Sequence, residues 1–298
     1  DGQLSYVALM DARSIAATVL NGGALTAATE LPHVPEDPAR EPYEYDDTPY
    51  RNRVYYGVGK ARPEAELVFG PNIADWPEQI ALPQDLLLTA ACAIYDPVTT
   101  TDELIPSGET SSYRSNPLGL AEFTLSRKDP EYVGRAKAVQ AEEKARRAGE
   151  GSAEVLAQLH KVPGCENLTW NDVQIASTIF AVKPGDGSAR EQAASCQRVL
   201  GAGANIVTEY ATKRYRSNLI NWGMLPFITE ENDQALSFKN GDYLFVPEIR
   251  KAVEEKASEV KAYLVGEDLK EISLKLGDMT DAEREIICKG CLINYYRG

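Results

Sequence analysis

The sequence contains few residues of the kinds that bind metals, and it has no long hydrophobic run. Only two of its 298 residues are histidines, His33 and His160, and five are cysteines. Neither histidine has the spacing of a metal site, and an odd number of cysteines in a long chain with a normal apolar fraction indicates reduced thiols. No apolar stretch approaches the roughly 20 residues that a membrane-spanning helix requires. A disulfide-stabilised secreted domain, a membrane protein and a metal site within this chain are therefore not expected.

Basic residues are in the minority as well. The 31 Lys and Arg residues are outnumbered by 45 Asp and Glu residues, which gives a formal net charge of −14 at pH 7. Negative charge repels the phosphates of nucleic acids, so a general DNA-binding or RNA-binding role is disfavoured. No signal peptide is recognisable, and we expect a soluble cytoplasmic protein. The length allows one large domain or two modest ones.

One pair of cysteines, Cys288 and Cys291, has a spacing that also occurs in metal sites. Two cysteines cannot complete a zinc or iron–sulfur site, which needs four N or S ligands, or three and an open position. We therefore predict that both side chains pack in the core, with a metal role as the alternative that the spacing leaves open.

The most informative stretch begins with an apolar, β-branched run at Ile175–Val182, which predicts a strand. Residues 183–187, Lys-Pro-Gly-Asp-Gly, are dense in turn-forming residues and predict a loop. Ser188 and Glu191 have the spacing of a capping box, in which each side chain bonds the other residue's backbone N–H. We therefore expect a helix that starts at Ser188 and ends near Leu200, where Gly-Ala-Gly follows.

A strand, a glycine loop and a helix in succession direct unpaired backbone N–H groups to one place, which suits an anion. Arg190 lies in the first turn of the helix, where the helix dipole opposes a cation at a cost of about 0.3–1 kcal/mol. A residue that contradicts its local preference indicates function. We predict a carboxylate or phosphate pocket, with Arg190 as a planar donor and backbone N–H groups from the region of Gly187 and Ser188. From the spacing alone, the alternative is that Ser188 only caps the helix and Arg190 is an ordinary surface residue.

Two blocks of this region resemble the aconitase superfamily. Gly185–Glu191, with the sequence GDGSARE, resembles the G-E-G-S-S-R-E signature of the mobile swivel domain, which closes over the iron–sulfur domains. Residues 204–227 resemble the strand, the helix and the Gly-Leu-Leu-Pro turn that follow it in the family. The helix carries an Asn-Leu pair, here Asn218 and Leu219. The two blocks are in register over about forty residues, which is far more specific than either glycine motif alone.

Two more segments resemble the mouth of the family's site. Residues 99–108, TTTDELIPSG, are similar to its T-T-D-x-I-x-P-x-G loop. Thr101 and Asp102 could bond backbone N–H groups across a turn, and Asp102 could orient an arginine. As bare sequence the same residues are a turn with only a structural role. The resemblance is looser at Arg114, which we predict to be the second arginine near the pocket. Thr101, Asp102 and Arg114 are therefore all expected to bind substrate.

The resemblance implies an α/β fold, in the form of a swivelling β/β/α domain with a mixed sheet flanked by helices. We interpret residues 1–29 as a remnant helix of the preceding iron–sulfur domain, residues 30–82 as an extended linker and residues 83–298 as the swivel domain. The alternative for the first segment is the N-terminal helix of a complete protein. A helical insertion at residues 118–161 is longer than the family pattern, and the sequence does not indicate its role.

Hydrophobic patterning and turn signals predict the other elements. Strands are expected at Arg53–Val58, Glu66–Phe69, Asp85–Ile94, Tyr243–Val246, Val260–Val265 and Glu271–Leu276. Helices are expected at Leu4–Leu20, Leu118–Ser126, Pro130–Arg147 with Asp129 as N-cap, Ser152–His160 and Glu248–Ala257, and after a Thr280–Glu283 capping box.

The resemblance also implies a chemistry. Ser188 would abstract the proton α to a carboxylate of a small hydroxy-carboxylate substrate, and Arg190 would hold a substrate carboxylate. A 4Fe–4S cluster in the missing N-terminal domains would act as a Lewis acid, with no cofactor in this chain itself. Ala189 replaces the family's second serine, whose hydroxyl would bond a substrate carboxylate. The loss of this hydrogen bond should weaken binding of the usual tricarboxylate by about 1.5–3 kcal/mol. The expected function is therefore that of a divergent aconitase-like hydro-lyase, inactive without its iron–sulfur domains.

Two other functions compete with this interpretation. The chain could be a recognition or regulatory module, similar to the small subunits of isomerases, which works with a cysteine-rich large subunit. It could also be a non-catalytic relative that binds RNA, although the negative net charge conflicts with that role.

Overall fold

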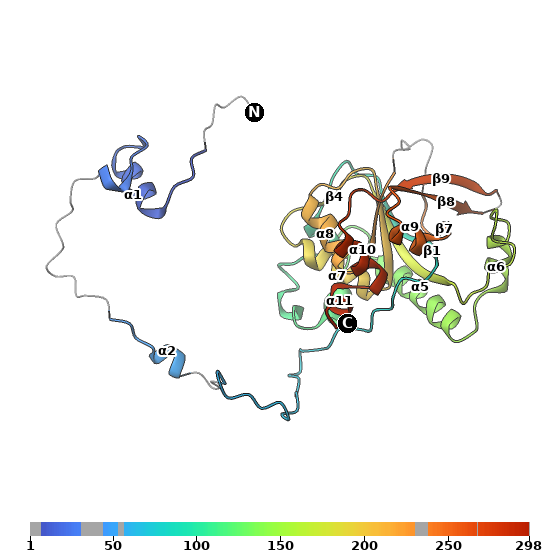
Figure 1. Cartoon of the computed structure of the whole chain (residues 1–298), viewed down its shortest axis with the longest axis horizontal. Helices are drawn as coiled ribbons and strands as arrows, with labels where there is room; N and C mark the ends of the chain where they lie inside the picture. Colours follow the sequence, from blue (N-terminus) through green and yellow to red (C-terminus); the bar gives the residue numbers. More distant parts are fainter. Residues whose placement is uncertain (1–6, 31–43, 53–56, 230–237, 267, 298) are drawn as a thin grey trace. The chain divides into compact units, whose positions relative to one another are not determined.

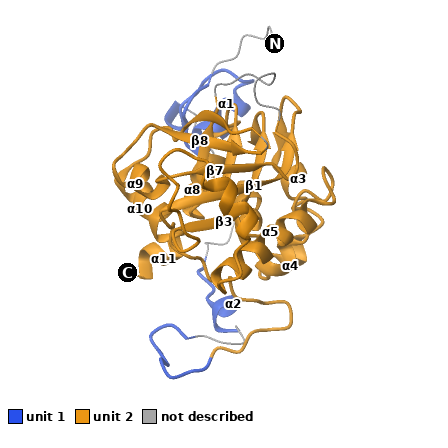
Figure 2. Cartoon of the chain, turned by 90° about the vertical axis from the view of Figure 1, so that its right-hand side faces the viewer, with its two compact units in different colours: residues 1–66 blue, residues 67–298 orange. Residues whose placement is uncertain are grey.

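The computed structural model describes residues 7–30, 44–52, 57–229, 238–266 and 268–297 (Figure 1). The chain divides into two compact units, residues 1–66 and residues 67–298 (Figure 2). All described strands belong to the second unit. Within the described ranges, every helix is too short or too polar to cross a membrane.

In its described residues, the first unit contains three short helical elements, α1 (Ala12–Leu20), η1 (Ala28–Glu30) and α2 (Thr48–Arg51). The helix predicted at Leu4–Leu20 is present, but its predicted start is wrong, because the helix begins at Ala12 and the described residues 7–11 are not helical. Asp11 caps it, because its carboxylate accepts from the backbone N–H groups of Arg13 and Ser14. These bonds, above all those from Ser14, lower the pKa of Asp11. Val19 and Leu20 are about 70% exposed on this helix, so the described residues of the unit leave these two apolar side chains uncovered.

The predicted linker has little regular structure where it is described. The strand expected at Glu66–Phe69 is wrong, since these residues form no regular secondary structure. Most of the strand expected at Arg53–Val58 lies outside the described residues, as does His33. The end of the linker is attached to the second unit, because the Leu82 backbone N–H donates to the carbonyl of Cys288 at 3.0 Å.

Seven strands of the second unit form one mixed sheet (Figure 1). Parallel pairing joins β1 (Asp85–Ile94), β3 (Val173–Ala181), β5 (Ala202–Val207) and β6 (Leu225–Ile228). Antiparallel pairing joins β7 (Tyr243–Val246), β8 (Glu259–Val265) and β9 (Lys270–Lys275) to each other and β7 to β1. A single pair, Ile228 with Lys275, connects β6 to β9. The α/β class with a mixed sheet is confirmed, as are the predicted strands at 85–94 and 243–246 and the hairpin of β8 and β9.

Helices flank this sheet (Figure 1). They are α3 (Thr101–Leu104), η2 (Ser111–Tyr113), α4 (Pro117–Ala121), α5 (Tyr132–Arg147), α6 (Ala153–Leu159), α7 (Arg190–Val199), α8 (Lys213–Asn221), α9 (Ile249–Glu254), α10 (Asp281–Lys289) and α11 (Leu292–Arg297). The capping box of Thr280 with Glu283 is confirmed, and so is Ser152 as the cap of α6. The predicted cap at Asp129 is wrong, because α5 begins after Glu131.

Both faces of the parallel strands are buried, which explains why their sequences are almost continuously apolar. On one face, alternate residues such as Leu86, Leu88 and Phe180 form a cluster with α8, α9 and α10. On the opposite face, part of the sheet packs against α4, α5, α7 and α8. Cys288 lies in the first of these clusters and Cys291 in the second, so the packing interpretation of this pair is confirmed.

Gly223 offers a test of the packing between α8 and α10. It has a φ of +68°, and a Cβ atom built on it would lie 2.0 Å from the carbonyl oxygen of Gly290. Gly223→Ala would combine left-handed backbone strain with a clash against backbone, so we expect it to lower the free energy of unfolding by about 2–4 kcal/mol. Urea denaturation measures this change.

The matched control is Gly241→Ala. Gly241 has a φ of +94°, but no atom of another described residue that packs against it lies within 4 Å of its built Cβ. Gly241→Ala should lower the free energy of unfolding only by the cost of the left-handed backbone conformation, about 1–2 kcal/mol. Equal losses for the two variants would contradict the proposed role of the contact with Gly290.

Candidate functional site

Two loops of the second unit meet through a short parallel pair of strands. β4 (Pro184–Asp186) follows β3 and pairs with β2 (Thr99–Thr100), which follows β1. Beyond this pair the chain enters α7 on one side and α3 on the other. The predicted glycine loop and the predicted threonine loop are therefore neighbours.

Gly187 is the point of closest approach between these loops. Its φ is +138°, and a Cβ atom built on it would lie 2.1 Å from Oγ1 of Thr101. Thr101 itself is only 3% exposed. A side chain at position 187 would push the two loops apart, so glycine is required here both for its conformation and for its small size.

The start of α7 differs from the prediction. The N-cap residue is Ala189, no side chain caps the helix, and the predicted capping box of Ser188 with Glu191 is wrong. The Glu191 carboxylate instead accepts a hydrogen bond of 3.0 Å from the indole Nε1 of Trp222, whose ring packs 4.4 Å from that of Trp76. The Ser188 hydroxyl is exposed and forms no hydrogen bond with another described residue.

Ser188 and Arg190 line the same hollow, which has a volume of about 370 Å³. Its other lining residues are Glu191, Lys213, Arg214, Ser217 and Asn218. The hollow lies between the N-terminal ends of two helices, because α7 begins at Arg190 and α8 begins at Lys213. Thr212 fixes the second helix relative to the loop, since its Oγ1 accepts from Tyr215 N at 3.2 Å and donates to the Gly185 carbonyl at 3.3 Å.

The charge of this hollow is positive. Arg190, Lys213 and Arg214 supply three cations against the single carboxylate of Glu191. None of the three cations forms an ion pair with a described residue, and the Nε of Arg190 is buried without a hydrogen-bond partner. Both helix N-termini add further positive potential. The arrangement can bind an anion with more than one negative charge.

The described residues contain no group of three or more His, Cys, Asp or Glu side chains that could hold a metal ion. The five cysteines are free and buried. Burial raises the pKa of the Cys196 thiol to about 12, and it also raises the pKa of Cys92. A neutral thiol is a poor metal ligand. His160 is used locally, since its Nε2 lies 2.9 Å from the carbonyl oxygen of Leu168.

Residues 157–232 match the family model of the aconitase C-terminal domain. This segment belongs to that family. It contains Ser188, Arg190 and every other residue that lines the hollow. No curated protein matches the chain. Among solved structures, the chain is similar to 3-isopropylmalate dehydratase from Methanocaldococcus jannaschii, with 20% identity and a TM-score of 0.42, over 72% of this chain and 93% of that chain.

The other residues that were predicted to bind substrate do not line the hollow. Gly187 directly precedes Ser188 in the chain, and Thr101 lies against Gly187. Asp102 does hold an arginine, but this is Arg127, which also pairs with Glu109. Arg114 is exposed at the end of η2, outside the lining of the hollow.

Sequence reasoning missed Lys213, Arg214 and Ser217. A signal was available, because Lys213 and Arg214 are two cations in the first turn of a helix, as Arg190 is. The starts of α7 and α8 lie beside each other because of tertiary packing, and a local sequence pattern does not show such packing.

The contact of Gly187 with Thr101 can be tested by a double-mutant cycle. We expect Gly187→Ala to lower the free energy of unfolding by about 2–3 kcal/mol, because of backbone strain and the overlap with Oγ1. Thr101→Ala removes this oxygen, so the double variant should be more stable than the sum of the single changes predicts, by about 0.5 kcal/mol or more. Strict additivity in urea denaturation would contradict the contact.

Proposed function

We propose that this chain supplies the swivel domain of an aconitase-like hydro-lyase, which dehydrates and rehydrates a hydroxy di- or tricarboxylic acid. One observation carries the proposal. The Ser188 hydroxyl and the Arg190 guanidinium line one positively charged hollow at the start of α7, within the segment that matches the aconitase C-terminal domain.

Ser188 is the proposed base. A serine hydroxyl is a very weak base, and its alkoxide becomes accessible only where positive charge and donors stabilise the anion. The hollow offers such surroundings, because the two helix N-termini and the Arg190 side chain meet beside Ser188. The hydroxyl is exposed and uncommitted to a capping bond, so it can lose its own proton to solvent, and the resulting alkoxide can take the proton from the carbon α to a substrate carboxylate.

Arg190 is the proposed carboxylate ligand, with Lys213 and Arg214 as further cations. A guanidinium binds a carboxylate through two parallel hydrogen bonds, whereas an ammonium acts as a point charge. Three cations suit a substrate with two or three carboxylates. Ala189 lacks the hydroxyl of the family's second serine, and the cations at the start of α8 offer an alternative place for that carboxylate.

The iron–sulfur cluster that the family resemblance implies does not fit the described residues of this chain, which hold no cluster of metal-binding side chains. We propose that the cluster lies in N-terminal iron–sulfur domains of the same protein or in a large subunit. In this arrangement the hollow forms one wall of the reaction site and the partner forms the other, so closure of the two bodies assembles the site.

The first test is Ser188→Ala in the complete enzyme. Loss of the proposed base should lower kcat by about 10²–10⁴-fold and change KM by only a few-fold. Ser217→Ala is the matched control, because Ser217 is a serine of the same hollow at a different helix. Steady-state kinetics on a series of hydroxy acids measure both variants. Unchanged turnover in Ser188→Ala would remove Ser188 from the mechanism.

The second test is Arg190→Lys, which keeps the charge and removes the planar pair of donors. We expect it to raise the dissociation constant of the substrate or of a dicarboxylate analogue by about tenfold or more. Arg216→Lys is a suitable control, since Arg216 lies on the neighbouring helix α8 and donates to the carbonyls of Leu276 and Asp278 instead of lining the hollow. Isothermal titration calorimetry gives the affinities. Equal affinities for both variants would contradict the proposed binding of a substrate carboxylate by Arg190.

A further inference from the structure

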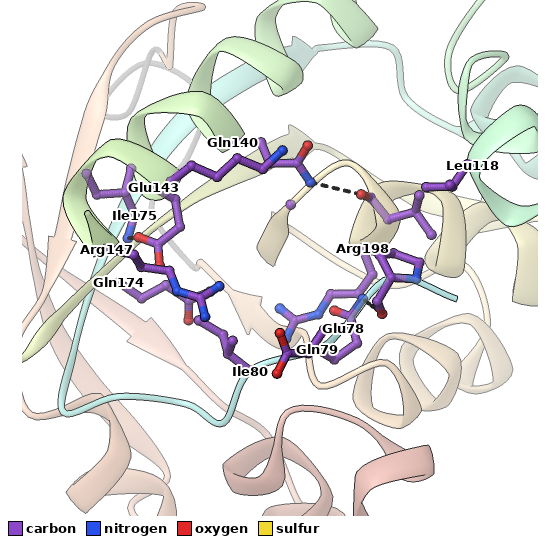
Figure 3. A pocket seen from close by; sticks show the side chains of 14 residues that line it. Glu78, Gln79, Ile80, Leu118, Gln140, Glu143, Arg147, Gln174, Ile175 and Arg198 are labelled. Atoms are coloured by element: carbon purple, nitrogen blue, oxygen red, sulfur yellow. Dashed lines mark hydrogen bonds between the residues drawn. The ribbon is translucent and has the colours of Figure 1, made fainter. Parts of the chain in front are cut away.

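A second polar cavity lies at the C-terminal end of α7, where Arg198 and Val199 line it. Figure 3 shows the side chains that line this cavity. Its volume is about 330 Å³. Its walls come from the segment of residues 77–80, from α5, from the start of β3 and from the C-terminal end of α7. Since α7 has 10 residues, its two ends are separated by about 15 Å, and the cavity is distinct from the hollow at Ser188.

Arg198 is the unusual residue of this cavity. Its side chain is only 5% exposed, yet no described carboxylate forms an ion pair with it. Its Nη1 donates to the Ala202 carbonyl at 3.0 Å and its Nη2 donates to the Gly290 carbonyl at 3.1 Å. Nε is buried and has no hydrogen-bond partner. Burial lowers the pKa of Arg198 to about 10, so the group remains a cation at neutral pH.

Further positive charge comes from α5. Arg147 and Lys144 line the cavity, and neither pairs with a carboxylate of the described chain. Figure 3 shows the guanidinium groups of Arg147 and Arg198 reaching into the same space from two different helices. A buried charged donor without its full set of partners is costly, so this arrangement is expected to have a negatively charged ligand.

The acidic residues of the lining do not cancel this charge. The Glu143 carboxylate accepts from Arg146 Nε at 2.7 Å and from the backbone N–H of Ile175 at 2.8 Å, so it is already committed. Glu78 is the other carboxylate in the lining. Lys144, Arg147 and Arg198 carry three positive charges, and Glu78 carries one negative charge. The cavity therefore has an excess of two positive charges, which a dianion would match.

We propose that this cavity is a second binding site, for a small oxyanion with two negative charges whose oxygen atoms accept hydrogen bonds from Arg198 and Arg147. A small dicarboxylate and inorganic phosphate share this chemistry. The site does not depend on the function proposed for Ser188, and none of its residues lines the first hollow.

The test uses the full chain with the substitution Arg190→Gln, which weakens anion binding at the first hollow. Gln140 and Gln174 line the second cavity, and their side-chain amide signals in ¹H–¹⁵N NMR spectra report on it directly. We expect saturable shifts of these signals on titration with succinate or with inorganic phosphate. Saturation by one of them alone identifies the ligand as a dicarboxylate or as a phosphate.

A second variant tests the proposed ligand residues. Arg147 is exposed, so Arg147→Gln should fold normally and should raise the dissociation constant by about tenfold or more. The matched control is Lys137→Gln, because Lys137 is another cation of α5 that pairs with Glu122 and does not line the cavity. The proposal is overturned if neither anion shifts the two amide signals, or if Arg147→Gln leaves the dissociation constant unchanged.

Discussion

The fixed position of α7 is the constraint on which the candidate site depends. At its N-terminal end, the β2–β4 pair and the contact of Gly187 with Thr101 hold the chain just before the helix. At its C-terminal end, Arg198 bonds the carbonyls of Ala202 and Gly290 and so connects α7 to β5 and to α10. Because both ends are held by other elements, the helix does not need a side-chain cap. The hydroxyl before it is left available for another role.

The electrostatics of the hollow favour a ligand-bound state. Arg190, Lys213 and Arg214 lie at helix N-termini, where each cation costs about 0.3–1 kcal/mol without a counter-ion. An anion between the two helices removes this cost and gains charge-assisted hydrogen bonds. The sequence alone identified Arg190 by this argument and could have identified the other two cations. It could not show that all three face one hollow, since that depends on the packing of α8 beside α7.

The sequence predicted the elements better than it predicted the contacts at the site. Three serine or threonine caps were expected from similar local patterns, and those at Ser152 and Thr280 are confirmed. The one at Ser188 is wrong, because the carboxylate of Glu191 bonds the indole of Trp222, 31 residues away in the chain. A capping pattern describes only which bond is possible within one turn. Whether it forms depends on competing donors that arrive from elsewhere in the fold.

The helical insertion, whose role the sequence left open, has a structural explanation in α5. β3 begins before the point where β5 pairs with it, since the first pair of the two strands is Ser177 with Ala202. On the side of β5, the backbone of Ile175 therefore has no strand partner. Glu143 of α5 supplies the missing acceptor, and Arg146 neutralises its buried charge. Apolar residues of α5, such as Ala136, pack on the adjoining face of the sheet. A helix in this position therefore closes an exposed edge of the sheet, and in doing so it places Arg147 opposite Arg198.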